Sequence, residues 1–204
     1  MDRMRVEFLG TGTSTGVPMI GCRCDVCRSK DSRDRRLRSS VCLTVDDKNI
    51  LIDCGPDFRQ QMLRSGIDHI DAVLLTHEHY DHTSGLDELR NFSRNNPIPI
   101  YAEPNVLDII HQRLFYCFSK QPNPGVAHLE LKAIENLSPF TLFGIDIEPV
   151  RVWHYRLPII GYRIGRFAYI TDMLTIPTHH TSFSTGMWCS SAIFFNLHTV
   201  WRPM

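Results

Sequence analysis

The feature that most constrains this chain is a cluster of histidines and one aspartate directly after a short apolar run. The run Ala72–Leu75 predicts a buried strand, and the segment Thr76–His82 that follows it reads THEHYDH. A strand that stops and turns can direct the first two histidines to one point and the aspartate and last histidine to a neighbouring one. Imidazole and carboxylate donors this close together favour two divalent metal ions such as Zn, Mn or Fe over a polar surface loop. The candidate ligands are His77, His79, Asp81 and His82.

Composition limits the class of protein. The chain has 204 residues, of which 43% are hydrophobic and 22% charged, as expected for one folded domain or two small ones and not for a disordered, collagenous or coiled-coil protein. Lys plus Arg equals Asp plus Glu at 22 each, so net charge indicates neither a nucleic-acid partner nor an anionic membrane. No run approaches the ~18 apolar residues of a membrane span, and the N-terminus has no signal-peptide core. We therefore expect a cytoplasmic protein with no membrane partner.

Short β-rich runs dominate the chain and are mostly bounded by Gly, Pro, Asn or Asp. Helices are predicted over 57–65, ending at Gly66, over 86–94, and over 104–119, where apolar residues recur at spacings of three and four. This order favours an α/β fold with two mixed sheets packed together and helices outside. The predicted strands are Arg5–Leu9, Val41–Val45, Asn49–Asp53, Ala72–Thr76, Pro99–Ala102, Ile145–Val152, Ile159–Ile164 and Phe167–Thr171.

Three of the seven cysteines lie within six residues, at Cys22, Cys24 and Cys27. Three thiolates with this spacing can share one tetrahedral zinc, with a fourth ligand from elsewhere in the chain. The alternative is a set of buried, unreactive cysteines, but the polar neighbours Arg23 and Asp25 argue against full burial. In a reducing compartment clustered thiols are more often metal ligands than disulfides, so we expect a structural zinc site here.

The segment Arg28–Arg38 carries six basic and two acidic residues, a local excess of four positive charges. It is either a solvated loop or a source of electrostatic attraction for a phosphorylated substrate. The glycine-rich segment Gly10–Gly16 lacks the lysine of a nucleotide-binding phosphate loop, so nucleotide binding of that type is not expected.

The residues His77–His82 match the H-x-H-x-D-H motif of the metallo-β-lactamase superfamily. Around them, Phe8–Pro18 and Ile52–Arg59 resemble the branch that contains the phosphoribosyl 1,2-cyclic phosphate phosphodiesterases of phosphonate catabolism. The resemblance covers roughly residues 4 to 177. It implies a four-layered αββα metallo-β-lactamase-like sandwich with a dinuclear metal site at one edge of the two sheets.

The resemblance also implies the rest of the ligand set. A later histidine and a metal-bridging aspartate match His154 and Asp172, although without the resemblance His154 would be typical of a structural histidine and Asp172 of a helix cap. One metal would be held by His77, His79 and His154, and the other by Asp81 and His82, with Asp172 bridging. Asp81 and His82 are then the catalytic residues. In the resembled branch a late histidine completes a structural zinc site at the cysteine cluster.

The C-terminal segment departs from the family pattern. Among residues 173–204 the only Asp, Glu, Lys or Arg is Arg202, and none of His179, His180 and His198 lies in the context of the family's late histidine ligand. A buried final strand over 192–197 is one explanation, and a non-native or truncated ending is the one we favour. We therefore expect a hydrolase domain over 1–177 and an atypical tail over 178–204, with both metal sites short of one histidine.

These observations predict a metal-dependent hydrolase, with a metal-bridged hydroxide attacking a small cyclic phosphate ester. An RNA-processing endonuclease and a thioester or lactone hydrolase on the same fold are the alternatives within hydrolases. An inactive, zinc-stabilised binding protein is the alternative outside them. The expected partner is a small phosphorylated substrate; nucleic acid is allowed but not favoured, and the apolar tail allows a homodimer.

Overall fold

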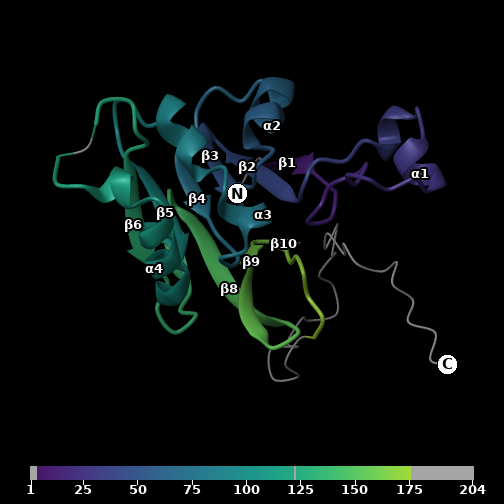
Figure 1. Ribbon diagram of the computed structural model, residues 1–204. Coiled ribbons are helices and arrows are strands. Elements are labelled where there is room, and N and C mark those ends of the chain that lie inside the picture. The colour runs from purple at the N-terminus through teal and green to yellow at the C-terminus, as the bar shows by residue number, and fades with distance from the viewer. Residues whose placement is uncertain (1–3, 122, 176–204) are drawn as a thin grey trace. The chain divides into compact units, whose positions relative to one another are not determined.

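The structure is a computed structural model that describes residues 4–121 and 123–175 (Figure 1). The chain divides into two compact units, residues 1–135 and residues 136–204, and each contains one β-sheet. The predicted tail over 178–204 lies outside the described residues, together with His179, His180 and His198, so the expectations about it stay predictions. Within the described part of the chain, none of the helices has the length and apolar character needed to cross a membrane.

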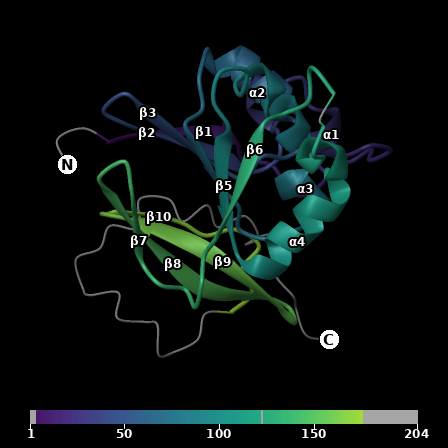
Figure 2. The same cartoon turned by 90° about the vertical axis from the view of Figure 1, so that its left-hand side faces the viewer.

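The first unit contains a six-stranded mixed sheet, whose spatial order follows the chain (Figure 2). The first three strands pair antiparallel, and the last four form parallel pairs. The central strands are almost wholly apolar and buried, as is typical of strands covered on both faces. The strands are β1 (Met4–Gly10), β2 (Ser40–Val45), β3 (Lys48–Ile52), β4 (Ala72–Leu74), β5 (Ile98–Ala102) and β6 (Leu129–Ala133).

Helices of the first unit pack on one face of this sheet. Phe58 and Met62 of α2 (Phe58–Ser65) and Val106 and Ile110 of α4 (Pro104–Arg113) belong to one core cluster with side chains of the strands. As predicted, α2 ends at Gly66, whose φ of 72° is left-handed. Two short helices, α1 (Asp25–Arg28) and α3 (Tyr80–Thr83), and three 3₁₀ turns, Ser32–Asp34, Leu86–Asn91 and Phe115–Phe118, complete the unit.

Two of the three helix predictions need correction. The predicted helix over 104–119 ends at Arg113, because the backbone of Leu114 leaves helical geometry (φ −111°, ψ 33°) and the aromatic run Phe115–Phe118 continues as a 3₁₀ turn. The predicted helix over 86–94 is a 3₁₀ turn, Leu86–Asn91. In both segments the apolar spacing was right, since Leu86, Leu89 and Cys117 are buried, but it does not separate the two kinds of helical turn.

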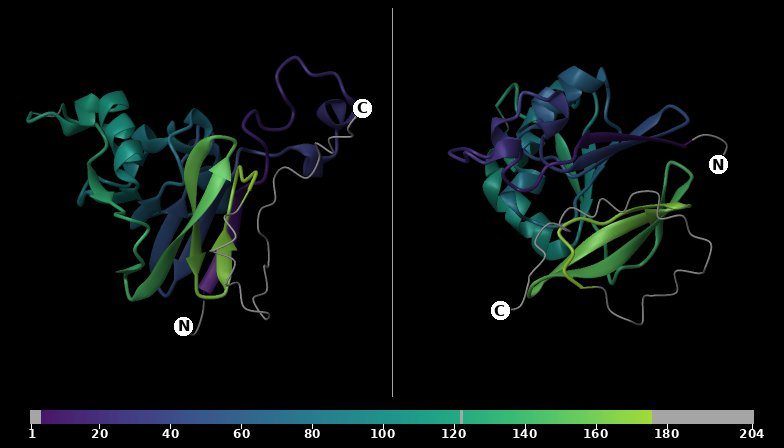
Figure 3. Two further views of the ribbon diagram at one scale, coloured as in Figure 1. Left: turned by 90° about the horizontal axis from the view of Figure 1, so that it is seen from below. Right: turned by 90° about the vertical axis from the view of Figure 1, so that its right-hand side faces the viewer.

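The second unit contains a four-stranded sheet with the order β10-β9-β8-β7. Figure 3 shows this sheet in green to yellow-green. Its strands are β7 (Phe140–Leu142), β8 (Ile145–His154), β9 (Leu157–Ile164) and β10 (Phe167–Tyr169). The prediction of a second mixed sheet is wrong, because every described pair in it is antiparallel and joined by a short turn. The sequence analysis missed β6, an edge strand, and β7, which has only three residues.

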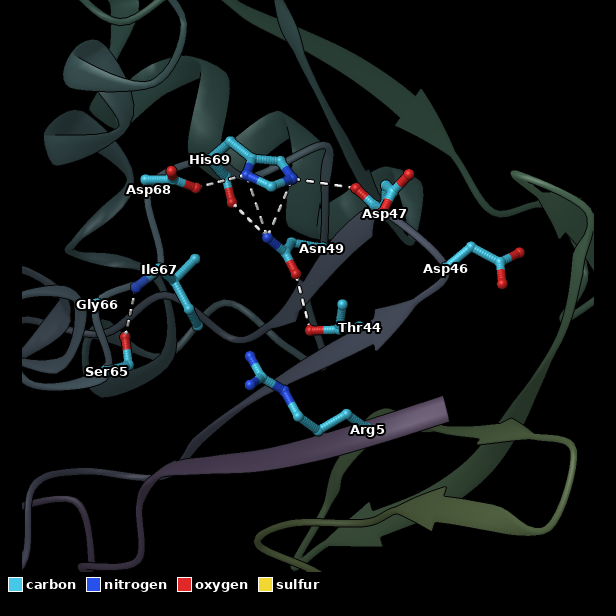
Figure 4. A pocket seen from close by; sticks show the side chains of 10 residues that line it. All are labelled: Arg5, Thr44, Asp46, Asp47, Asn49, Ser65, Gly66, Ile67, Asp68 and His69. Carbon is cyan, nitrogen blue, oxygen red and sulfur yellow. Dashed lines mark hydrogen bonds and ion pairs between the residues drawn. The ribbon is translucent and has the colours of Figure 1, made fainter. Parts of the chain in front are cut away.

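A polar cavity of about 330 Å³ lies at the start of β3 (Figure 4). Here His69 links the connection before β4 to the β2–β3 hairpin. Its Nδ1 atom lies 2.7 Å from Oδ1 of Asp68, and its Nε2 atom lies 3.1 Å from the carbonyl oxygen of Asp47. The hydrogen bond to Asp68 is the main cause that raises the pKa of His69. His77, His79, Asp81 and His82 lie beyond the opposite end of the central strands, so this cavity is separate from these four candidate ligands.

Candidate metal centre

The residue that organises the candidate site is Asp53, which directly follows β3. Its carboxylate is fully buried and accepts hydrogen bonds from the main-chain N–H of Thr76 at 2.9 Å, from the Thr76 hydroxyl at 3.0 Å and from Nδ1 of His82 at 2.8 Å. Its backbone has a left-handed φ of 61°, a conformation that aspartate tolerates better than most residues. Because β3 and β4 are parallel, their carboxyl ends meet, which brings Asp53 beside the motif.

Four motif residues gather within the first unit. The ring centroid of His77 lies 4.6 Å from that of His79 and 4.3 Å from that of His82, and Oδ2 of Asp81 lies 3.2 Å from Nε2 of His82. His77 and His82 are buried, while His79 is only partly buried and forms the N-cap of α3. The turn from β4 into this short helix therefore gathers the candidate ligands that the sequence analysis named.

The hydrogen bonds around Asp53 determine which nitrogen each buried ring presents. The Thr76 hydroxyl has one proton and directs it to Asp53, so its oxygen accepts from Nδ1 of His77 at 2.9 Å. His82 donates from Nδ1 to Asp53 directly. A neutral ring held in this way keeps its lone pair on Nε2, which is the tautomer that binds metal.

The donor set fits a divalent cation. In that tautomer Nε2 of His82 and the carboxylate of Asp81 are both acceptors, yet they lie only 3.2 Å apart. Two acceptors at this distance are stabilised by a positive charge, which either a proton on Nε2 or a bound cation supplies. The residues of the first unit could therefore hold a metal through imidazole nitrogens and a carboxylate oxygen, the donors that zinc and manganese accept.

Two glycines let the motif lie against the segment that carries Asp53. A Cβ atom on Gly55 would lie 2.0 Å from the carbonyl oxygen of Asp81, and one on Gly85 would lie 2.1 Å from the carbonyl oxygen of Gly55. The N–H of Cys54 donates to the carbonyl oxygen of His82 at 2.7 Å. The Asp53–Gly55 segment and α3 thus form one close-packed main-chain unit, in which no larger residue fits at either glycine.

The two later residues of the predicted set lie in the second unit. His154 is the last residue of β8, and Asp172 follows β10 with a left-handed φ of 51°. A ligand atom of His154 lies within 4.8 Å of a carboxylate oxygen of Asp172, and the Thr171 hydroxyl donates to Oδ1 of Asp172 at 3.3 Å. The second unit therefore brings its two candidate ligands together, and their role as ligands stays a prediction.

The cysteine cluster is also a compact group. The sulfur atoms of Cys22, Cys24 and Cys27 all lie within 4.8 Å of one another, with Cys24 exposed and the other two half-buried. The alternative of three buried, unreactive thiols is therefore wrong for this cluster, whereas Cys42, Cys54 and Cys117 are buried.

Hydrogen bonds within the cluster affect the thiols unequally. Contacts with Cys27, first through its main chain, and with Cys22 lower the pKa of the Cys24 thiol. The Cys27 thiol accepts a hydrogen bond from the N–H of Met19 at 3.4 Å, and this contact lowers its pKa. Desolvation and the neighbouring thiols of Cys22 and Cys24 together outweigh it, so the pKa of Cys27 is raised. Cys24, the exposed member, is thus the thiol that ionises most readily of these two, and thiolates are the form that binds zinc.

Asp53 and Thr76 were missed as functional residues by the sequence analysis. Asp53 lies in the segment Ile52–Arg59, and Thr76 lies in the segment Thr76–His82. Their position could have indicated a function, because each is a polar residue directly after an apolar run. Where two such strands are parallel neighbours, polar residues at their carboxyl ends meet. The pairing of β3 with β4 was the missing information.

The sequence matches the family described as "Beta-lactamase superfamily domain" over residues 48–190, well over half of the chain. The chain belongs to the beta-lactamase superfamily. This confirms the resemblance found from the motif and the predicted mixed α/β fold class. The family match includes both the motif residues in the first unit and His154 and Asp172 in the second.

Two solved structures of the superfamily are similar to this chain. A diphosphatase from the PhnP family is 40% identical, with a TM-score of 0.79, and the alignment covers 87% of this chain and 69% of that one. The zinc-bound PqqB from Methylobacterium extorquens is 27% identical, with a TM-score of 0.65, over 82% of this chain and 62% of that one. Structural relatives of this beta-lactamase superfamily chain thus include a protein that acts on diphosphates and one that binds zinc.

A sequence relative of this beta-lactamase superfamily chain is named for acyl transfer, not for phosphate chemistry. An octanoyltransferase from Porphyromonas gingivalis is 53% identical over 174 residues, which are 85% of this chain but 35% of that protein. The chain spans about half the length of the coenzyme PQQ synthesis proteins B that it also matches. Because about two thirds of the octanoyltransferase lies outside the match, its name can describe a part that this chain does not share.

Proposed function

We propose that this chain is a metal-dependent phosphodiesterase that hydrolyses a small phosphate ester, with a cyclic phosphate ester as the preferred class. The observation that carries the proposal is the pair of buried imidazoles, His77 and His82, both oriented by Asp53 to present Nε2. The 40% identity with a PhnP-family diphosphatase supports phosphorus as the reacting centre.

For the metals, we propose the ligand set that the family resemblance implies. His77, His79 and His154 would hold one divalent ion, zinc or manganese, and Asp81 and His82 the other, with Asp172 shared. When bound, two such ions supply Lewis-acid stabilisation of the charge that develops on phosphoryl oxygens. Asp81 and His82 are then the proposed catalytic residues.

The chain's own residues contribute orientation and burial. Asp53 holds the Nδ1 proton of His82 and, through the Thr76 hydroxyl, the Nδ1 proton of His77. Neither ring can rotate without breaking a buried hydrogen bond, which costs roughly 1–3 kcal/mol. This fixed geometry lowers the reorganisation needed when charge develops on the substrate.

The basic segment is proposed to attract the anionic substrate. Arg33 pairs with Asp31 and Arg38 with Asp57, but among the described residues of this segment Arg28 and Lys30 make no ion pair. Arg38 also connects the segment to the site, because Asp57 is the N-cap residue of α2, two positions after Gly55. Positive charge with no acidic partner raises the local concentration of phosphate esters through its field.

We also propose one structural zinc at Cys22, Cys24 and Cys27, since three thiolates within 4.8 Å of one another are a suitable donor set. Six described cysteines are free thiols, which supports the reducing cytoplasm as the compartment.

A thioester or ester hydrolase acting on a medium-length acyl group is the second candidate. It is favoured by the 53% identity with a protein named octanoyltransferase. The short coverage of that protein, 35%, argues against transferring its name, and the same metal centre would be needed for acyl hydrolysis.

The test is metal analysis of the chain purified without chelator, followed by a substrate panel. The panel contains bis(p-nitrophenyl) phosphate, a five-membered cyclic phosphate of a sugar, a diphosphate ester and an octanoyl thioester. Two metals at the His/Asp site and turnover of the phosphodiesters that is lost in His79→Ala support the proposal. Turnover of the thioester alone would replace it with the second candidate, and turnover of no substrate by a metal-loaded chain would contradict both.

A further inference from the structure

A cation from outside the motif holds the main chain between two candidate ligands. Arg113, the last residue of α4, donates from Nη1 to the carbonyl oxygen of Glu78 at 2.6 Å. Glu78 lies between His77 and His79, so its peptide group is part of the main chain that holds these two residues relative to each other. Arg113 is 35 positions away in the sequence and belongs to no motif of the superfamily resemblance.

The same guanidinium nitrogen reaches a second support. Nη1 of Arg113 also lies 3.2 Å from Oγ1 of Thr83, and the Thr83 hydroxyl donates to the carbonyl oxygen of His79 at 2.9 Å. Thr83 is only 3% exposed, so its hydroxyl proton is held in place. The carbonyl oxygens on both sides of His79 are thereby fixed by one two-residue network.

These contacts meet a specific need of the main chain. His79 has an extended backbone (φ −60°, ψ 149°) just before α3, so the carbonyls of Glu78 and His79 lie where the chain changes from strand to helix. The His79 carbonyl already accepts the main-chain N–H of His82 at 3.1 Å, so the Thr83 hydroxyl is its second donor, whereas the Glu78 carbonyl accepts from the Arg113 side chain. The rings of His77 and His82 are held by hydrogen bonds at their Nδ1 atoms. For His79, the hydrogen bonds from Arg113 and Thr83 hold the main-chain carbonyls of Glu78 and of His79 itself.

Arginine in the last turn of a helix has a simpler explanation, which is attraction to the helix dipole. The contacts of Arg113 within the described residues favour a further role, since its side-chain hydrogen bonds go to Glu78 and Thr83 and not to the carbonyls of α4. A bond from a charged donor is also stronger than one from a neutral donor.

We propose that Arg113 is a positioning residue of the metal centre: it fixes the Glu78 carbonyl and supports Thr83, which holds the His79 carbonyl, and it thereby constrains the relative orientation of His77 and His79. The proposal rests on the proposed function insofar as the motif binds metal. It adds the residue that adjusts the geometry of the first two ligands without touching a metal itself.

The experiment uses the full chain, five single variants and the double variant Arg113→Met/Thr83→Val. Arg113→Met removes the donors but keeps most of the apolar stem, and Arg113→Lys keeps the charge. Thr83→Val removes the hydroxyl, and Thr83→Ser keeps it. Gln112→Ala is the control, because Gln112 is an exposed neighbour on α4 with no contact to the motif. Each protein is titrated with Co²⁺ alone, read from its visible absorption, and amide hydrogen exchange over residues 76–83 is measured without metal.

We expect Arg113→Met and Thr83→Val each to weaken Co²⁺ binding about three- to tenfold, to change the shape of the absorption band, and to speed amide exchange in the motif. Their effects should not add in the double variant, because both residues belong to one network. Thr83→Ser and Gln112→Ala should match the parent, with Arg113→Lys intermediate.

The outcomes separate the two proposals. If the parent binds Co²⁺ and Arg113→Met has the same affinity, spectrum and exchange as Gln112→Ala, the positioning role is contradicted while the metal-dependent function stands. If the parent shows no Co²⁺ bound by nitrogen and oxygen ligands, as distinct from the sulfur ligands of the cysteine cluster, the proposed function fails. In that case the role of Arg113 at a metal centre is overturned as well. Amide hydrogen exchange over residues 76–83 then shows only whether Arg113 holds the main chain of the motif.

Discussion

Nδ1 of His82 donates to Oδ2 of Asp53 at 2.8 Å, and this buried contact joins the end of β3 to the helix that follows β4. The two residues are 29 positions apart, yet the same carboxylate also orders His77 through the Thr76 hydroxyl. One aspartate thus determines the tautomer of two candidate ligands. A carboxylate suits this role because both of its oxygens accept hydrogen bonds, from the Thr76 hydroxyl and from Nδ1 of His82. An amide side chain has only one acceptor oxygen.

The first prediction is that Asp53→Asn weakens metal binding about 10- to 100-fold, the usual cost of losing a group that orients a metal ligand. Asparagine tolerates the left-handed backbone at this position, so the change tests the carboxylate and not the main chain. Binding is measured by competition with a coloured zinc chelator. Asp71→Asn, at the opposite end of the central strands, is the control, and equal affinities in the two variants would contradict the role of Asp53.

The second prediction concerns the proposed ligands themselves. His79→Ala and Asp81→Ala should each abolish hydrolysis of any accepted ester while the far-ultraviolet circular dichroism spectrum stays unchanged. Neither side chain belongs to the apolar core cluster of the first unit, so its loss removes little buried apolar area. Turnover is measured with the substrate that the parent accepts, at saturating metal.

Tyr80→Phe serves as the matched control for this pair, because Tyr80 is 69% exposed and lies between the two ligands in sequence. Near-parental turnover by His79→Ala or Asp81→Ala would show that the motif is not the catalytic centre.

The sequence predicted much of this structure, and the failures have physical reasons. All eight predicted strands exist, because their apolar runs are buried whichever neighbour they pair with. The strand β6 was missed although Leu129 and Leu131 alternate with Glu130 and Lys132, since only two of its five residues are large and apolar and it lies at a sheet edge. The motif residues were found from spacing alone. Asp53, Thr76 and Arg113 were not, because their roles depend on which strands and helices are neighbours.

The third prediction is a pH-dependent contribution from His69. Its folded pKa is raised, mainly by the hydrogen bond to Asp68, so it stabilises the fold fully below its unfolded pKa, and this stabilisation is lost as pH rises through the higher folded pKa. Asp47 and Asn49 in the hairpin and Asp71 beside it are the other polar groups that face the ring. His69→Ala should therefore lower Tm by about 1–2 °C near pH ~5.5 and by less near pH ~9.

The size of this effect is small because the side chain of His69 is 53% exposed and the pair is screened by solvent. Thermal unfolding at the two pH values is the measurement, and Asp68→Asn should reproduce the loss at low pH. A Tm difference between parent and His69→Ala that is the same at both values would rule out the ion pair as its cause.

The last prediction concerns the cysteine cluster and separates it from the catalytic site. Cys24→Ser should lower the bound zinc by about one ion per chain and reduce Tm, because a structural zinc site contributes its binding free energy to folding. The His/Asp residues should still bind metal, since the two clusters share no ligand.

Val26→Ser is the matched control. Val26 lies in α1 between Cys24 and Cys27 and is 52% exposed, so its substitution changes the same turn without removing a thiol. Zinc per chain is counted by elemental analysis after gel filtration, and Co²⁺ spectra distinguish sulfur from nitrogen ligands. The same zinc content in Cys24→Ser, Val26→Ser and the parent would contradict the structural zinc proposal, and loss of both kinds of site in Cys24→Ser would show that the two clusters depend on each other.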